Sequence, residues 1–183
     1  MQTFPVYTME SAPERSKPSL ASLQQAFGII PNIAGAMATS PVLIASLVAL
    51  FSKVHSGSFS EAQIQTVLLT NAVTNAAEWP VAFHTTLALK EGIDAVDVKA
   101  IRERSVPRDN KLAALSTLAR TLIEKRGHIS EKDADAFIAA GFGKDHLLEV
   151  VVIVAASTIT NYTASITNPP VEAAFQEHAW RAA

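Results

Sequence analysis

The longest uninterrupted segment of this sequence, residues 144–167, does most to limit the possible folds. It runs for more than twenty residues without a Gly or a Pro, which is too long for an ordinary strand. Its β-branched centre at residues 150–154 would by itself suit a buried strand. Length and continuity nevertheless favour a helix. Because apolar residues occupy nearly all of its sides, we expect this helix to be buried at the centre of a helical bundle.

The rest of the chain carries repeated signals for helix starts and ends. Ser40 followed by Pro41 is typical of a helix start, and Ser60 with Gln63 resembles a capping box. No hairpin dipeptide and no long alternation of polar and apolar residues is present. The sequence therefore predicts an all-α, single-domain bundle over residues 18–183, preceded by an extended arm at residues 1–17. The expected helices run from Ser19 to Phe27, from Ser40 to Gly57, from Ser60 onward, from Trp79 to Gly92, over residues 94–104, from Asp109 to Gly127 and from Ser130 to Gly141, with a turn at Pro31 and Asn32.

The composition bears on the partners that the protein can have. Only 17% of the 183 residues are charged, against roughly 25% in an average soluble domain. A monomer this poor in charge would leave apolar surface exposed, so we expect a homo-oligomer that buries part of it between subunits. The net charge of -2 and the scattered Lys and Arg residues argue against nucleic acid as a partner.

The sequence carries no signal for secretion or for membrane insertion. Its N-terminus is polar and proline-containing, without the apolar stretch of a secretory signal. The most apolar run, residues 147–159, is shorter than the roughly 20 residues that span a bilayer. We therefore expect a soluble, cytoplasmic protein without a membrane partner.

The chain contains no cysteine at all. Disulfides and thiolate metal sites are therefore impossible, and so is every reaction in which a thiolate attacks a peroxide or exchanges a disulfide. A P-loop, a glycine-rich dinucleotide motif and a nucleophile elbow are also missing from the sequence. We expect neither a metal nor a cofactor, because four of the five histidines stand singly, without the spacing of metal ligands: His55, His128, His146 and His178.

Several motifs, spread over nearly the whole chain, match the pattern of one known family. They are Phe27-Gly28 with Ile30-Pro31-Asn32, then Ser40-Pro41, Phe59-Ser60-Glu61, Asn161-Tyr162, the segment from Asn168-Pro169-Pro170 to Phe175, and Ala179-Trp180. In these motifs the chain resembles the AhpD / carboxymuconolactone decarboxylase-like family, in its longer, peroxidase-related branch. The resemblance implies an AhpD-like helical bundle that forms a homodimer and can assemble further into a trimer of dimers.

The family's redox core, E-x(11)-C-x-x-C-x-x-x-H, survives here at one position only. His84 matches the histidine, whereas the two cysteine positions hold Ala77 and Pro80, and the glutamate position holds Gln65. The alkylhydroperoxidase activity that the family name implies is therefore contradicted by the residues of this chain. The match also predicts that His84 lies at the junction of the helices that begin at Ser60 and Trp79.

Two functional hypotheses remain. The first is a thiol-independent acid–base enzyme of decarboxylase, lyase or isomerase type that acts on a small carboxylated molecule, with His84 and Glu78 as catalytic residues. The second is a non-catalytic descendant that binds a ligand or serves as a scaffold, in which His84 is sealed by packing while Trp79 and Pro80 fill the cysteine space. For a small-molecule ligand, the candidate binding residues are polar or aromatic: Gln65, Asn75, Trp79, Asn161 and Tyr162.

Overall fold

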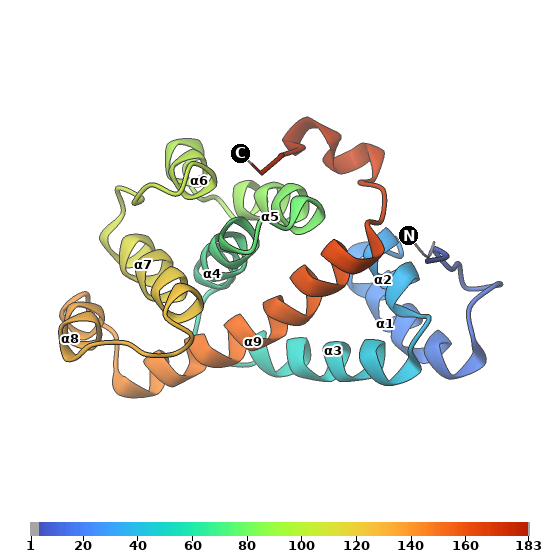
Figure 1. Cartoon of the computed structure of the whole chain (residues 1–183), viewed down its shortest axis with the longest axis horizontal. Coiled ribbons are helices and arrows are strands. Elements are labelled where there is room, and N and C mark those ends of the chain that lie inside the picture. Colours follow the sequence, from blue (N-terminus) through green and yellow to red (C-terminus); the bar gives the residue numbers. More distant parts are fainter. Residues whose placement is uncertain (1–3, 183) are drawn as a thin grey trace.

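The segment predicted to be the longest helix forms α9 (Lys144–Thr167), which crosses the whole molecule (Figure 1). It packs against α2, α3, α4, α5, α7 and α8. The helix ends at Asn168, whose φ of 46° is left-handed, and the following prolines cannot continue it. A helix of this length therefore joins the two ends of the bundle.

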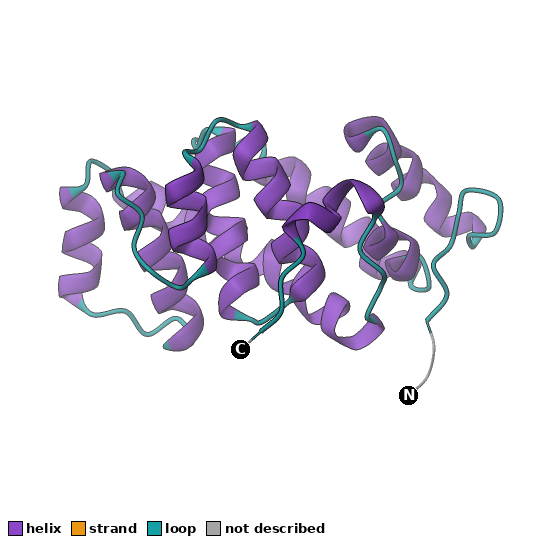
Figure 2. Cartoon of the chain, turned by 90° about the horizontal axis from the view of Figure 1, so that it is seen from above, coloured by secondary structure: helices purple, strands orange, loops and turns teal. Residues whose placement is uncertain are grey.

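The computed structural model describes residues 4–182, and in that part of the chain every regular element is a helix (Figure 2). The all-α, single-domain prediction is confirmed. Before α9 the elements are the 3-10 helix η1 (Glu14–Ser16), α1 (Lys17–Phe27), α2 (Asn32–Met37), α3 (Pro41–Val54), α4 (Glu61–Thr74), α5 (Glu78–Lys90), α6 (Ala95–Arg102), α7 (Asn110–Glu124) and α8 (Glu131–Ala139), and after it comes the 3-10 helix η2 (Ala173–His178).

The helix-start signals read from the sequence work as expected. The Ser60 side chain accepts a hydrogen bond from the Gln63 backbone N–H, and the Gln63 side chain accepts one from the Ser60 backbone N–H. Ser40 caps α3 by accepting from the backbone N–H of Leu43. Gly28 ends α1 with a left-handed φ of 75°.

Two predictions near the N-terminus need correction. α1 begins at Lys17 after Ser16, two residues before Ser19. The segment predicted as a turn after Pro31 continues into α2, a six-residue helix. All of its residues from Ile33 to Met37 are buried, so the segment has no polar face and no helical periodicity that the sequence could reveal.

The prediction that α9 is the central, buried helix holds for one side of it only. One side of α9 packs into the core through Val150, Ile153 and Ala156. Leu148 and Ile166 lie on another side, and each of them is 66% exposed. By length and composition α9 could span a bilayer, but 44% of its most apolar window is buried inside the protein. A helix that packs on one side only can be apolar all round in sequence and still face the exterior.

The N-terminal arm packs onto its own chain. Ala12 is buried and Tyr7 is partly buried in the cluster that contains α2. Gly35 allows this close approach, because a Cβ atom there would lie 2.7 Å from the carbonyl oxygen of Tyr7. The arm was predicted over residues 1–17; residues 1–3 lie outside the described part, and η1 and the first residue of α1 occupy its end.

α4 is the helix around which the rest is arranged. It packs against α5, α6, α7 and α9, and every residue from Ile64 to Val73 is buried. Polar side chains on this helix therefore need partners inside the protein. They find them on α5, α7 and α9, and the first of these contacts forms part of the candidate site.

Candidate functional site

The connection between α4 and α5 brings the candidate residues together. α4 ends with Asn75 as its C-cap, Ala76 takes a left-handed φ of 53°, and Ala77 is the N-cap of α5. So short a turn makes the two helices antiparallel neighbours. The middle of α4 then faces the middle of α5, which sets Gln65 beside His84.

The prediction that His84 lies at this helix junction is confirmed. Its Nδ1 atom is 3.0 Å from Oε1 of Gln65, and both side chains are 4% exposed. Burial, followed by the nearby positive charge of His55, lowers the pKa of His84 to about 3. The imidazole is therefore neutral at pH 7, and its amide partner does not titrate. The pair holds a hydrogen bond between α4 and α5, and the lowered pKa of His84 is far from the value that suits a general acid or base near neutrality.

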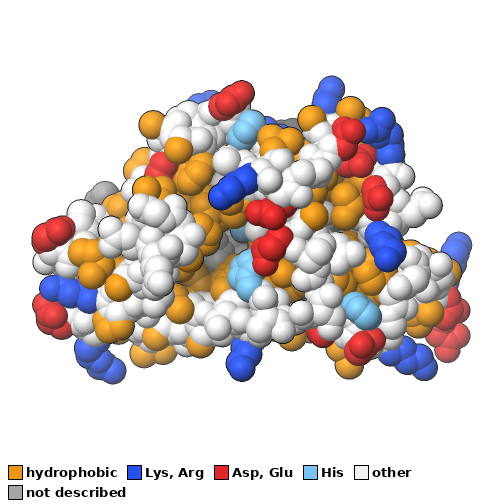
Figure 3. All heavy atoms as spheres, turned by 180° about the vertical axis from the view of Figure 1, so that it is seen from behind, with side chains coloured by type: hydrophobic (Ala, Val, Ile, Leu, Met, Phe, Trp, Pro, Cys, Tyr) orange, Lys and Arg blue, Asp and Glu red, His pale blue; other side chains and the backbone are white. Residues whose placement is uncertain are grey.

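A second polar pair lies one helical turn earlier along α4. Nδ1 of His55, at the end of α3, is 2.9 Å from Oε1 of Glu61, and the His55 ring stacks on Phe51. Glu61 and Gln65 are four residues apart and so lie on the same side of α4. Figure 3 shows the back of the molecule, which is hollowed near its middle between hydrophobic side chains, with histidine side chains beside the hollow. His55 and Glu61 are thus ionisable groups next to the buried His84.

Three asparagines form a separate polar cluster between α4 and α9. The side-chain amide of Asn71 donates to the carbonyl of Val154 at 2.9 Å, and that of Asn161 donates to Oδ1 of Asn71 at 3.2 Å. Asn75 donates to the backbone carbonyl of Asn71 and also contacts its Oδ1. These bonds tie the helices together and leave Asn75 and Asn161 away from His84. Their predicted role in ligand binding stays a prediction.

Tyr162 lies apart from the other candidates. It follows the buried Asn161 on α9 but is 58% exposed, because neighbouring positions on a helix point about 100° apart. Its phenol therefore belongs to the outer face of α9 rather than to the helix junction. The ligand-binding role predicted for it is left without support from its position in the single chain.

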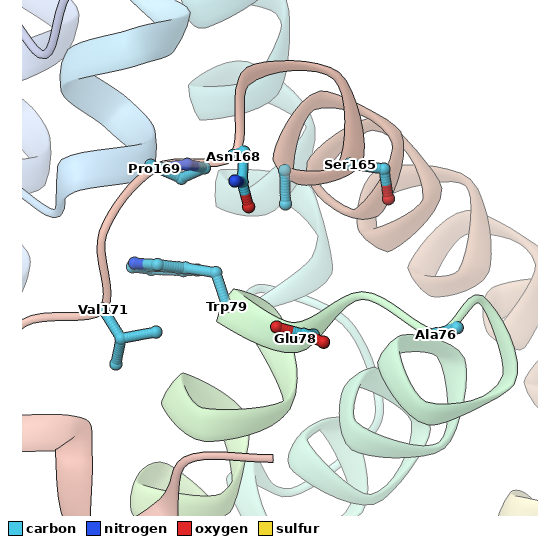
Figure 4. Close-up of a pocket in the computed structure, with 8 residues that line it drawn as sticks. Ala76, Glu78, Trp79, Ser165, Asn168, Pro169 and Val171 are labelled. Carbon is cyan, nitrogen blue, oxygen red and sulfur yellow. The ribbon is translucent and has the colours of Figure 1, made fainter. Parts of the chain in front are cut away.

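A cavity of about 320 Å³ opens at the start of α5 (Figure 4). Glu78 is the only charged residue among those that line it, and Trp79 forms one wall. His84 is not among the lining residues. The cavity therefore lies at the turn between α4 and α5, where the family motif has its first redox cysteine. It does not reach the histidine. Its lining residues are Ala76, Glu78, Trp79, Ala164, Ser165, Asn168, Pro169 and Val171.

Trp79 is fixed by contacts on two sides. Its ring stacks on Phe83 at a centroid distance of 5.0 Å, and its Nε1–H donates to Oε2 of Glu172 at 2.9 Å. Oε1 of the same carboxylate accepts the backbone N–H of Asn32 at 2.6 Å. One carboxylate thus links α5, the start of α2 and the segment after α9. The rigid indole gives the cavity a defined apolar wall.

Sequence reasoning missed Glu172 and the returning chain that carries it. After α9 the chain turns at Asn168 and Pro169 and runs back over the start of α5, where it contributes Val171 to the cavity. The prolines predicted only that the helix ends. A lone carboxylate in an apolar segment is a signal that could have singled out Glu172, since such a group needs donors nearby.

The two former cysteine positions are filled by packing. Ala77 is 1% exposed, and Pro80 is buried in the first turn of α5, where its missing N–H costs no helical hydrogen bond. Within residues 4–182 no group of three His, Asp or Glu side chains is arranged to hold a metal ion.

Comparison with known proteins places this geometry in a known fold. No family model and no curated protein matches the sequence. Among solved structures, an uncharacterized peroxidase-related protein from Ralstonia eutropha with an AhpD core superposes with a TM-score of 0.82 at 15% identity, over 94% of this chain and 93% of that chain. A peroxidase-related protein from Silicibacter gives 0.78 at 16% identity, over 95% of both chains.

The debrominase Bmp8 is similar to the same extent, with a TM-score of 0.78 at 15% identity, over 95% of this chain and 94% of that chain. A C82A variant of Bmp8 has been solved with 2,3,4-tribromopyrrole bound, and it superposes with a TM-score of 0.77. At these identities the likeness establishes the fold and nothing further. The chain thus has the AhpD-like fold that its motifs suggested, and it has this fold without any cysteine.

Proposed function

We propose that this chain is a thiol-independent protein that binds a small molecule in the cavity at the start of α5, without proton transfer at His84. The observation that carries the proposal is the cavity beside Trp79, in which Glu78 is the one charged residue of the lining. The buried pair of His84 and Gln65, whose histidine has a pKa of about 3, supports the absence of proton transfer at His84. A general acid or base works best when its pKa lies near the operating pH. This pair lies far from that condition and instead fixes α5 against α4.

The cavity lining supports a particular class of ligand. The Trp79 ring and Val171 supply apolar walls, while Ser165, Asn168 and the carboxylate of Glu78 supply polar groups, so that polar and apolar surface line the cavity about equally. A few convergent polar groups fix the orientation of a ligand in small-molecule sites. Because Glu78 is its only charge, the cavity favours a ligand that carries an ammonium or another hydrogen-bond donor. A carboxylated ligand, as expected from the sequence, would meet a like charge there.

One of the structural neighbours binds a small molecule. The Bmp8 variant holds 2,3,4-tribromopyrrole, a small flat molecule with one N–H donor. The chemistry named for Bmp8 is not transferred to this chain. The similarity supports only the choice of small aromatic donors as the first probes.

Calorimetric titration of the purified chain with matched aromatic amines and aromatic carboxylates tests the proposal. We expect the amines to bind, and Glu78→Gln to weaken them by roughly 10- to 100-fold, the worth of one charge-assisted hydrogen bond. Ser165→Phe should abolish binding by filling the cavity, whereas Ser165→Ala is the matched control. Binding of the carboxylates with higher affinity, or of neither series, would overturn the proposed site.

A second candidate is an acid–base enzyme of decarboxylase, lyase or isomerase type, favoured by the His55–Glu61 pair beside Gln65. An imidazole that is held by a carboxylate is a common arrangement for a general base. In this version His55 and Glu61 handle the proton, and His84 supplies a fixed hydrogen bond in the neutral form. The substrate would be a small carboxylated molecule that enters from the hollowed face.

The acid–base enzyme is tested by measuring the turnover of small lactone acids through the carbon dioxide that is released. This candidate predicts that Glu61→Gln lowers the rate by 100-fold or more, on the order of general acid–base contributions. Glu78→Gln, which alters the cavity instead, should leave the rate unchanged. Absence of turnover together with amine binding in the cavity would eliminate the enzyme and retain the binding protein.

A further inference from the structure

After α9 the chain returns along α5 as a separate segment, residues 169–182, which we call the C-terminal strap. It contains η2, which packs against α5. Figure 1 shows the strap rising from the end of α9 and passing over α5 toward α6. Within residues 4–182, the strap's backbone N–H groups bond only to carbonyls of the strap itself, as from Phe175 to Glu172 and from Ala179 to Gln176. Each hydrogen bond between the strap and the described rest of the chain therefore involves a side chain.

The first residues of the strap form part of the cavity. Pro169 and Val171 line it, and the close-up in Figure 4 shows both near the ring of Trp79. The next residue, Glu172, accepts the hydrogen bond from Nε1–H of Trp79 at 2.9 Å. A displacement of the strap would therefore remove two lining residues and free a third.

The middle of the strap is held by one aromatic side chain. Phe175 is 8% exposed and is the one buried residue of η2. Its ring packs edge-on against Phe83 at a centroid distance of 5.2 Å and against Trp79 at 6.4 Å. A segment with so few buried side chains undocks locally at a lower free-energy cost than a packed helix. The strap is therefore the part of the cavity wall that opens most readily.

Arg102, the last residue of α6, holds the far end of the strap. Its guanidinium donates to the carbonyl of His178 at 3.0 Å and to that of Ala179 at 3.3 Å. It also donates to Oγ1 of Thr85 at 2.8 Å, and this hydroxyl donates in turn to the carbonyl of Val81 on α5. The planar fork of an arginine suits such a set of acceptors, whereas the point charge of a lysine matches it poorly. Arg102 thus joins the strap to α5 and α6.

We propose that Arg102 is a positioning residue for the cavity, because it keeps the strap docked. The proposal rests on the proposed binding of a small molecule in this cavity. Arg102 is not among the lining residues. Its partner Thr85 lies six residues beyond Trp79, roughly 9 Å along the axis of α5. Arg102 therefore acts on a bound ligand only through the strap.

Ligand binding and strap docking are coupled in this arrangement. A ligand that contacts Val171 binds the docked form better, so binding favours docking and docking favours binding by the same factor. Undocking lowers the apparent affinity in proportion to the docked fraction. The two motifs near the end of the sequence, residues 168–175 and residues 179–180, thus correspond to the near and far attachments of the strap.

Limited digestion with chymotrypsin measures docking in the absence of ligand. Cleavage after Phe175, identified by mass spectrometry, requires its buried ring to leave α5, so its rate follows the undocked population. We expect Arg102→Ala to speed this cleavage by 10-fold or more, because one hydrogen bond to a charged group is worth about that factor. Lys99→Ala is the matched control, because Lys99 is exposed on the same helix and pairs with Glu103.

A milder variant guards against misfolding. Arg102→Lys keeps the charge and loses the fork, so it should speed the cleavage by a smaller factor than Arg102→Ala. Helical circular dichroism of each variant checks that the bundle is intact. Equal cleavage rates in the native chain and in both Arg102 variants would overturn the hold of Arg102 on the strap.

Calorimetric titration with the aromatic amines measures the coupling. Arg102→Ala should weaken their binding, by roughly 10-fold once the docked fraction falls to about one tenth, whereas Lys99→Ala should bind them as the native chain does. A saturating amine should in turn slow the cleavage after Phe175 in the native chain and in Arg102→Ala. Faster cleavage in Arg102→Ala with unchanged amine affinity would make the strap merely structural and overturn the proposal.

Failure of the positioning role and failure of the binding function give different results. If the native chain binds no amine while Arg102→Ala still speeds cleavage, the binding function is lost and the positioning role falls with it, leaving Arg102 as an attachment of the strap. If the native chain binds amines while Arg102→Ala changes neither cleavage nor affinity, the binding function stands and the positioning role alone is overturned.

Discussion

Acidification should destabilise this protein through His84. In the folded chain the pKa of His84 is about 3, against an ordinary value of 6.5, because burial disfavours the charged imidazole. The unfolded state therefore takes up a proton as the pH falls below about 6.5, whereas the folded state does not. The stability that depends on neutral His84 is fully present above pH 6.5 and is progressively lost as the pH falls toward 3.

The size of the effect follows from the two pKa values. At pH 5 the unfolded histidine is almost fully protonated and the folded one is neutral, which costs about 2 kcal/mol relative to pH 7. At pH 4 the loss would be about 3 kcal/mol by the same relation. These values are a large share of the stability of a domain of this size.

Urea unfolding at pH 7 and pH 5, at one fixed protein concentration, measures this loss. The matched variant is His84→Asn, whose amide can still bond to Gln65 but has no titrating group. The four other histidines are common to both proteins, so their contributions cancel in the difference. We expect the native chain to lose about 2 kcal/mol more than the variant between the two pH values. Equal losses in both proteins would refute the assignment of a depressed pKa to His84.

Three further predictions concern the same part of the molecule. Gln65→Glu places a carboxylate about 3 Å from the imidazole and should raise the pKa of His84 well above 3, since such a pair is worth about 5 kcal/mol at an effective dielectric constant near 20. Nuclear magnetic resonance of the ring measures this pKa, and an unchanged value would contradict the prediction. Glu172→Ala should cost about 1–3 kcal/mol and shift the Trp79 emission to longer wavelength, because two donors lose their acceptor, whereas Glu172→Gln should lose less. Organic hydroperoxides should be consumed no faster than in buffer, because the chain has no thiol; sustained turnover in metal-free buffer would show that another group reduces them.

Helix starts could be predicted from the sequence where a local hydrogen bond decides them. The capping box at Ser60 and the serine cap at Ser40 involve residues three positions apart, so the sequence contains the whole interaction. α2 could not be found in this way. Its helical state depends on burial from all sides by α1, α3, α9 and the arm, which is tertiary information.

The candidate site also has a part that could be predicted from the sequence and a part that depends on tertiary contacts. The place of His84 at the junction of α4 and α5 followed from a motif whose spacing carries over to this chain, although most of its residues have changed. The protonation state did not follow, because the pKa depends on burial that a motif does not record. Glu172 and the cavity beneath the returning chain escaped detection because a contact between residues 79 and 172 leaves no local pattern.

We infer that His84 ties two helices together in its neutral form and does not transfer protons. The most direct measurement is a pH titration of the His84 ring by nuclear magnetic resonance in the native chain, assigned by comparison with His84→Asn. We expect the ring signals of His84 to stay in the neutral form from pH 8 down to about pH 4. A midpoint for His84 between about pH 6 and pH 7 would overturn this inference and support acid–base catalysis at this residue.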